Sequence, residues 1–79
     1  MDTLRIVKTN MTLVDQVEDR LLNYFKENNL QIGDPIPNEM DLAASLGVAR
    51  NVLREALSRL KMIGMIESRP RRGMVLREP

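Results

Sequence analysis

Two arginines four residues apart, Arg50 and Arg54, are the side chains of this sequence best suited to bind a polyanion. Residues at that spacing project from the same face of a helix, and the apolar stripe Leu53, Leu57 and Leu60 occupies another face. An exposed arginine on such a helix donates two hydrogen bonds to guanine O6 and N7, worth ~1–3 kcal/mol of discrimination. We therefore expect both arginines to contact DNA. The alternative for Arg54 is an internal ion pair with a carboxylate such as that of Asp41.

Four more positions extend this candidate site. Asn51 lies about 100° around the helix from Arg50, where its amide reaches a base edge or a phosphate oxygen. Farther along, the segment 69–73 (Arg-Pro-Arg-Arg-Gly) places three arginines around a tight turn. Arginines at a turn tip enter a minor groove or clamp phosphates, which we expect of Arg71 and Arg72; the alternative is a solubilising loop tip. Gly73 is better explained by turn geometry.

These side chains need a helix, a tight turn and a second helix to position them. Asn38 is a good N-cap for a first helix that ends at Leu46. Gly47 follows, where the chain must adopt a positive φ, and Ala49 opens a second helix of about residues 49–63. Its inward face carries apolar residues at helical spacing, namely Leu53, Ala56, Leu57, Leu60 and Ile63. This order predicts a helix-turn-helix whose second helix enters the DNA major groove.

The flanking segments complete the predicted fold. Thr12 and Asp15 form a capping box at the start of a helix over about 12–28, and residues 33–37 form a rigid connector, in which Ile36 pairs as a strand or fills the core. The C-terminal pattern predicts strands at 65–69 and 74–77 around a turn. The fold class is mainly α with a small β-hairpin. It is a winged helix-turn-helix of three helices and a two- or three-stranded wing over residues 11–79, after an N-terminal arm or short strand at 1–10.

Two secondary expectations concern side chains outside the candidate site. Glu55 precedes Arg59 by four residues, which favours a surface ion pair worth a few tenths of a kcal/mol, with Arg59 otherwise solvated or near phosphates. Four methionines are expected to fill gaps in the core or in an interface: Met40, Met62, Met65 and Met74.

Composition narrows the class of protein. The 79 residues make one domain, without cysteine for a disulfide or zinc finger and without histidine as a metal ligand or general base. We therefore expect that the protein is not an enzyme and has no catalytic residue, metal or cofactor. We also expect no membrane span, since no apolar run approaches ~20 residues. The absence of cysteine is compatible with a cytoplasmic location. Charge is divided, with a net −4 over residues 1–47 and +5 over 48–79. This asymmetry predicts a polyanionic partner for the C-terminal part.

From about Val17 to Leu76 the sequence resembles the DNA-binding domain of the gluconate-repressor (GntR) family of bacterial transcription factors. The resemblance rests on Gly33-Asp-Pro-Ile-Pro-Asn-Glu-Met-Asp-Leu-Ala43, on Leu46-Gly-Val-Ala-Arg-Asn-Val-Leu-Arg-Glu-Ala-Leu-Ser-Arg-Leu60, and on Gly64-Met-Ile and Arg72-Gly73. It implies a repressor or activator that binds an inverted-repeat operator as a homodimer. It further implies a separate C-terminal domain that dimerises and binds a small-molecule effector.

At matching positions the resemblance implies DNA contacts from Arg50 and Arg54, a base or phosphate contact near Asn51, and minor-groove contact by the wing at 71–73. Two positions depart from the family pattern. Met40 replaces a family arginine, and Ala49 replaces a serine or threonine, which loses a helix cap worth about 0.5–2 kcal/mol and a phosphate bond. These departures predict weaker binding or an altered operator. The alternative function is a winged-helix module that binds an acidic protein and has no sequence-specific DNA binding.

Overall fold

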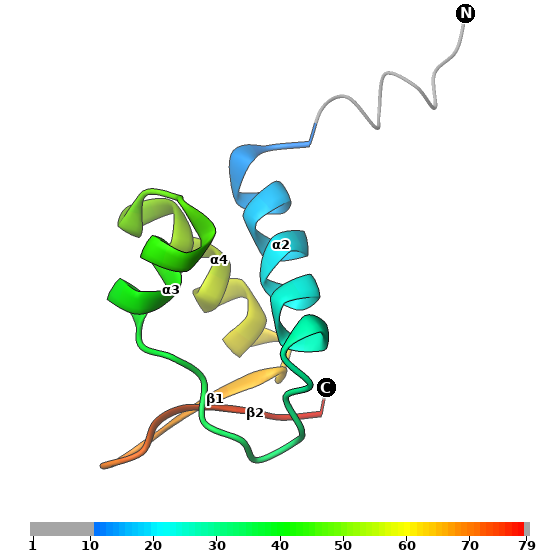
Figure 1. Ribbon diagram of the computed structural model, residues 1–79, viewed down its shortest axis with the longest axis vertical. Helices are drawn as coiled ribbons and strands as arrows, with labels where there is room; N and C mark the ends of the chain where they lie inside the picture. Colours follow the sequence, from blue (N-terminus) through cyan, green and yellow to red (C-terminus); the bar gives the residue numbers. More distant parts are fainter. Residues whose placement is uncertain (1–10, 79) are drawn as a thin grey trace, which may run out of the picture.

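A computed structural model describes residues 11–78 as three helices followed by a β-hairpin. The elements are α2 (Leu13–Glu27), α3 (Glu39–Leu46), α4 (Arg50–Met62), β1 (Ile66–Arg69) and β2 (Gly73–Leu76), and α2 packs along α4 with the hairpin beneath both (Figure 1). The predicted class, a mainly α winged helix-turn-helix, is confirmed. The arm or strand expected at 1–10 lies outside the described residues, as does residue 79.

Helix α2 begins at the predicted capping box. The Asp15 N–H donates to the Thr12 hydroxyl over 3.1 Å, and the Thr12 N–H donates to the Asp15 carboxylate over 3.1 Å. Val17, Leu21 and Phe25 are buried along one side, whereas Leu13 in the first turn is exposed. Asn29 has a φ of 53° just after the helix, a conformation that asparagine tolerates better than most residues. The predicted end at Asn28-Asn29 is confirmed.

The connector between α2 and α3 runs alongside β2 as a short third strand-like segment. Gly33 N–H donates to the Leu76 carbonyl over 2.7 Å, and Leu76 N–H donates to the Asp34 carbonyl over 3.0 Å. Ile36 N–H continues the pairing to the Met74 carbonyl over 2.8 Å, and its side chain is buried. Both roles predicted for Ile36 are therefore present. These hydrogen bonds join the hairpin to the connector, which leads directly into α3.

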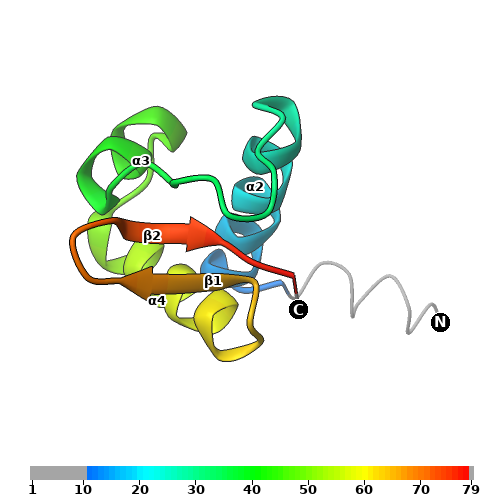
Figure 2. The same cartoon turned by 90° about the horizontal axis from the view of Figure 1, so that it is seen from below.

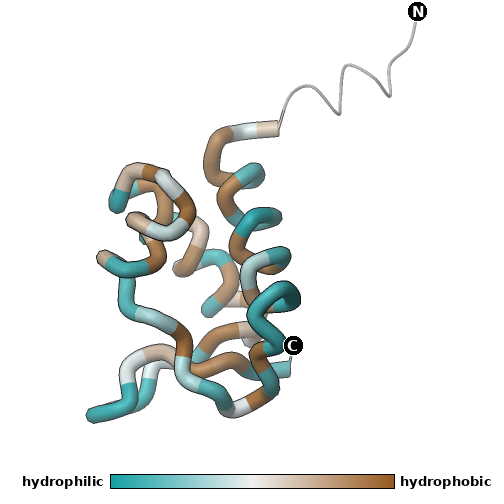
Figure 3. The backbone as a smooth tube through the Cα atoms, in the orientation of Figure 1, coloured by the Kyte–Doolittle hydropathy of each residue, from teal (hydrophilic) through white to brown (hydrophobic). Residues whose placement is uncertain are grey.

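The turn from α3 to α4 follows the predicted local chemistry. Asn38 caps α3 by accepting the Asp41 N–H over 2.8 Å, and Gly47 ends it with a φ of 66°. The Arg20 guanidinium of α2 also donates to the Leu46 carbonyl at that end. Ala49 is the N-cap of α4 and makes no side-chain capping bond. The inward faces of the two helices form the core with α2 (Figure 3), through Leu42, Ala43, Leu46, Leu53, Ala56, Leu57 and Leu60.

Three apolar residues lie farther out than the pattern indicated. Ile63 was expected to face the core and is 55% exposed, because α4 ends at Met62 and Ile63 is its C-cap. Met40 and Met62 are 61% and 85% exposed, so neither fills the core. Met65 and Met74 are partly buried against the core, as predicted.

The hairpin pairs β1 and β2 antiparallel, from Ile66 opposite Leu76 to Arg69 opposite Gly73. Its turn contains Arg71 at a φ of 67°, followed by Gly73 at 74°. Val75 is the fully buried residue of β2, and Met74 and Leu76 on either side of it are partly buried against the core. Figure 2 shows the two strands side by side with their turn on the α3 side, and in Figure 1 this turn extends below the helices as a wing.

Candidate nucleic-acid interface

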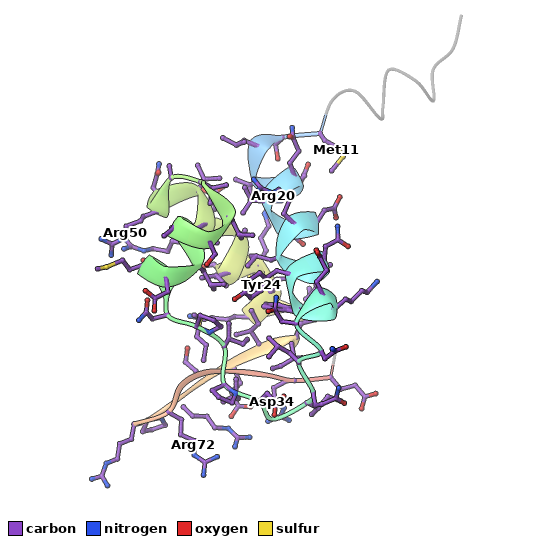
Figure 4. All side chains as sticks on the ribbon, in the orientation of Figure 1. Met11, Arg20, Tyr24, Asp34, Arg50 and Arg72 are labelled. Carbon is purple, nitrogen blue, oxygen red and sulfur yellow. The ribbon has the colours of Figure 1, made fainter. Side chains whose placement is uncertain are left out.

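Arg50 and Arg54 project from the first turns of α4 into solvent, with 57% and 63% of each side chain exposed. The apolar positions of the same helix are buried, so packing of Leu53 and Leu57 fixes which way the arginines face. Figure 4 shows Arg50 on the side of the molecule away from α2. The predicted exposure of this helix face is confirmed.

Glu39, the first residue of α3, holds the guanidinium of Arg54. The Arg54 Nε and Nη2 donate to one Glu39 oxygen, Oε1, over 3.1 and 2.9 Å, and Arg50 Nη2 lies 3.8 Å from the same oxygen. These bonds from Arg54 lower the pKa of Glu39 and raise that of Arg54. The carboxylate thus stays ionised and orients Arg54, while Arg50 is held more loosely.

An internal partner for Arg54 was the alternative raised by the sequence, but the partner is Glu39 rather than Asp41. As an acidic residue in the first turn of α3, Glu39 also suits the positive N-terminal end of that helix. The pairing of Glu39 with Arg54 depends on how α3 and α4 cross, which the sequence pattern does not give. A tight turn at Gly47 returns α4 past the start of α3, so the first residues of both helices come together.

Asn51 and Ala49 lie beside this pair of arginines. Both are exposed, and within residues 11–78 the Asn51 amide makes no recorded hydrogen bond. Its amide can therefore donate to and accept from a ligand at once. Ala49 offers only a methyl group at the N-cap of α4.

The wing tip presents the second group of cations. Arg71 and Arg72 are exposed, and neither forms an ion pair within the part of the chain that the structure describes. Arg69, the third arginine of the turn, is instead bound to Glu67 over 2.9 Å. Arg72 lies on the same side of the molecule as Arg50, away from α2 (Figure 4). The structure therefore brings one arginine of the helix and one of the wing, Arg50 and Arg72, to the same side.

Arg59 does not belong to this surface. The predicted pair with Glu55 is wrong: Arg59 Nη1 lies 2.6 Å from Asp15 Oδ1 and 3.4 Å from Glu18 Oε2, both on α2. Hydrogen bonds from the Thr12 backbone and from Arg59 lower the pKa of Asp15, and its carboxylate raises the pKa of Arg59. Arg59 joins α4 to α2 and is not left to solvent.

Other parts of the described chain offer less chemistry. An apolar hollow of about 370 Å³ lies between the end of α2 and the hairpin, lined by residues that include Phe25, Leu30 and Met65. Within residues 11–78, no group of three or more acidic, histidine or cysteine side chains is arranged so that it could hold a metal ion. The helices described there are too short or too polar to cross a membrane.

Three matches with known proteins agree with this geometry. Residues 13–76 match the family model described as "Bacterial regulatory proteins, gntR family". The sequence is 39% identical over 74 residues to the "Uncharacterized HTH-type transcriptional regulator YcbG" of Bacillus subtilis (strain 168), covering 92% of this chain and 32% of that protein. It is 45% identical over 65 residues to the "Putative L-lactate dehydrogenase operon regulatory protein" of Escherichia coli (strain K12), covering 82% and 25%.

Among solved structures, the chain resembles that titled "Streptococcus agalactiae GntR". The TM-score is 0.77 with 36% identity, covering 84% of this chain and 32% of the other. This chain thus spans about a third or less of the length of the proteins it matches. The matched part is the helix-turn-helix and its wing.

Proposed function

Because the chain belongs to the gntR family of bacterial regulatory proteins, we propose that it binds DNA sequence-specifically as the reading domain of a transcriptional regulator. It is not an enzyme under this proposal. Helix α4 enters the major groove, and the turn at 69–73 approaches the neighbouring minor groove.

The observation that carries the proposal is the placement of the exposed arginines. Arg50 on α4 and Arg72 on the wing, far apart in sequence, lie on the side of the molecule away from α2 (Figure 4), and Arg54 and Arg71 are exposed as well. A rigid core sets the separation of helix and wing, because β2 is tied to the connector and the connector leads into α3. The exposed arginines of the helix and of the wing fit a DNA duplex, which has two grooves and regularly spaced phosphates.

The side chains have different roles in this complex. Arg50 and Arg54 both read base edges, and Arg54 does so in the orientation that Glu39 gives it. Asn51 contacts a base or a phosphate, and Ala49 lies at the end of the helix nearest the groove floor. Arg71 and Arg72 bind phosphates or the minor groove, and Gly73 provides the turn.

The partner is double-stranded DNA, and the full-length protein binds it as a homodimer on an inverted repeat. Half-sites would then lie about 34–36 Å apart, or a multiple of that distance. We propose that dimerisation and the binding of a small-molecule effector belong to a part of the protein outside residues 13–76; the greater length of the matched relatives supports this proposal. A DNA partner places the protein in the bacterial cytoplasm, at the nucleoid.

The test is a binding-site selection from random DNA with the 79-residue chain, followed by footprinting and a salt titration on the selected site. We expect a defined footprint and an affinity that falls steeply with salt. Arg50→Ala should weaken binding to the selected site by about 5- to 150-fold, the range that ~1–3 kcal/mol per guanine contact gives. Lys26→Ala is the matched control, because Lys26 is an exposed cation at the far end of α2.

Two outcomes would contradict the proposal. One is binding that shows no preference among DNA sequences, and the other is equal loss with Arg50→Ala and Lys26→Ala. If the chain bound an acidic protein surface through the same arginines, Arg50→Ala would weaken that binding while the selection returned no consensus. The experiment therefore separates the DNA reader from the protein-interaction module.

A further inference from the structure

Two exposed apolar side chains flank the cations of the proposed DNA surface. Met40 is 61% exposed and makes no part of the core cluster. Ala49 is exposed at the N-cap of α4 and accepts no capping bond. Single exposed apolar side chains are common on protein surfaces, but these two lie beside the cations of the proposed DNA surface, where an apolar group can contact a base.

The structure places these two residues at the same junction. Glu39 Oε1 lies 3.8 Å from Arg50 Nη2 and 2.9 Å from Arg54 Nη2, so the first turn of α3 meets the first turn of α4. Met40 directly follows Glu39, and Ala49 directly precedes Arg50. Arg50 and Arg54 lie beside these two residues and attract a polyanion. The partner that covers Met40 and Ala49 is therefore DNA.

The major groove of B-DNA offers one prominent apolar group, the 5-methyl of thymine. Methionine suits it, since its flexible chain and polarisable sulfur adapt to a small apolar partner, and the alanine methyl is a second contact of the same kind. We propose that Met40 and Ala49 form an apolar contact that selects a thymine methyl beside the base pair read by Arg50. This inference rests on the proposed DNA-binding function and adds the base preference.

The test replaces each thymine of the selected site by uracil, which removes only the 5-methyl group. The expected result is one or two sensitive thymines in each half-site, next to the position that Arg50→Ala affects. Each should cost about four-fold in affinity, which corresponds to the ~0.8 kcal/mol of one buried methyl group. Placing 5-methylcytosine paired with guanine at the same position tests whether the methyl alone restores part of the preference.

Variants of the protein assign the effect to a side chain. Met40→Ala should lower affinity for thymine and leave little difference between thymine and uracil. Met62→Ala is the matched control, because Met62 is 85% exposed at the opposite end of α4, and it should retain the full difference. In a repeated selection Met40→Arg should shift the preference at this position from thymine to guanine, the base whose O6 and N7 an arginine binds.

Failure of this proposal differs from failure of the DNA-binding function. A selected site with no uracil-sensitive thymine, or a sensitivity that persists in Met40→Ala, would overturn the methyl contact and leave DNA reading intact. A selection that returns no consensus would overturn both.

Discussion

The first turn of α4 and the tip of the wing carry the same side chain in opposite surroundings. In α4, Arg54 is bound through two nitrogens to one oxygen of Glu39, with Arg50 3.8 Å from that oxygen. At the wing, Arg71 and Arg72 have no ion-pair partner within residues 11–78. Glu39 thus orients Arg54 and lies near Arg50, whereas no carboxylate within residues 11–78 orients Arg71 or Arg72.

The difference has consequences for recognition. An arginine held by a carboxylate gives up part of its attraction for any phosphate, but its guanidinium is held in one direction, which favours readout of particular base edges. An arginine without a carboxylate partner keeps its full charge and gains from every phosphate within reach, whatever the sequence. We therefore expect α4 to supply specificity and the wing to supply affinity.

The largest expected effect comes from removing both wing charges with Arg71→Gly and Arg72→Ala. Binding to the selected site and to scrambled DNA should fall together, each by about ten- to a hundred-fold at moderate salt, as loss of two phosphate contacts implies. The slope of log affinity against log salt should decrease in magnitude by about 2. Titration on both DNAs checks this, and a selective loss on the chosen site would show that the wing reads sequence.

Releasing the helix arginines should change specificity instead. Glu39→Gln removes the charge that holds Arg54, so affinity for scrambled DNA should rise several-fold and the salt slope should steepen by about 1. The ratio of selected to scrambled affinity should fall. Asp41→Asn is the matched control, because it removes an acid from the same turn of α3 that contacts no arginine among the described residues. Equal behaviour of the two variants would mean that only net charge matters.

Conformation and charge at the wing can be separated through Arg71. Its φ of 67° is unfavourable for a residue with a Cβ, and glycine adopts it freely. Arg71→Gly should therefore raise the free energy of unfolding by about 1 kcal/mol, while Arg71→Ala should not. Arg72→Gly is the control, because Arg72 has no positive φ and glycine there should destabilise slightly. Urea unfolding of the three variants measures the differences.

Much of the fold could be predicted because its signals are local. The Thr12–Asp15 box, the Asn38 cap and Gly47 each act within four residues, and all three were identified from the sequence. The buried face of α4 followed from spacing alone up to Leu60. The prediction was wrong at Ile63, because periodicity does not show where a helix passes the edge of the core.

Partners of charged side chains could not be predicted in the same way. Arg54 and Glu39 are 15 residues apart, and Arg59 and Asp15 are 44 apart. Each pair depends on how two helices cross, and the sequence does not state that geometry. Glu55 has the favourable helical spacing for an ion pair with Arg59, but the guanidinium of Arg59 pairs with carboxylates of α2 instead. Whether the arginine, asparagine and glycine positions contact DNA remains a prediction.

Arg59 provides the final test of the comparison, because this third arginine of α4 pairs with carboxylates of α2 instead of lying at the proposed DNA surface. The Thr12 backbone and Arg59 lower the pKa of Asp15, so the ionised carboxylate stabilises the folded state. That stabilisation is fully present above the ordinary pKa of about 4 and is lost as pH falls through the lower folded-state pKa.

Asp15→Asn should therefore unfold at lower denaturant than the unmodified chain at pH 7, and the gap should shrink as pH falls toward 2. Asp19→Asn is the matched control, because Asp19 is exposed on α2 and has no ion-pair partner within residues 11–78. DNA affinity of both variants at pH 7 should stay within about two-fold of the unmodified chain, since neither carboxylate contacts Arg50 or Arg54. Loss of specific binding in Asp15→Asn, with the fold intact, would mean that pairing with α2 also sets the direction of α4, and the division between orienting and anchoring arginines would fail.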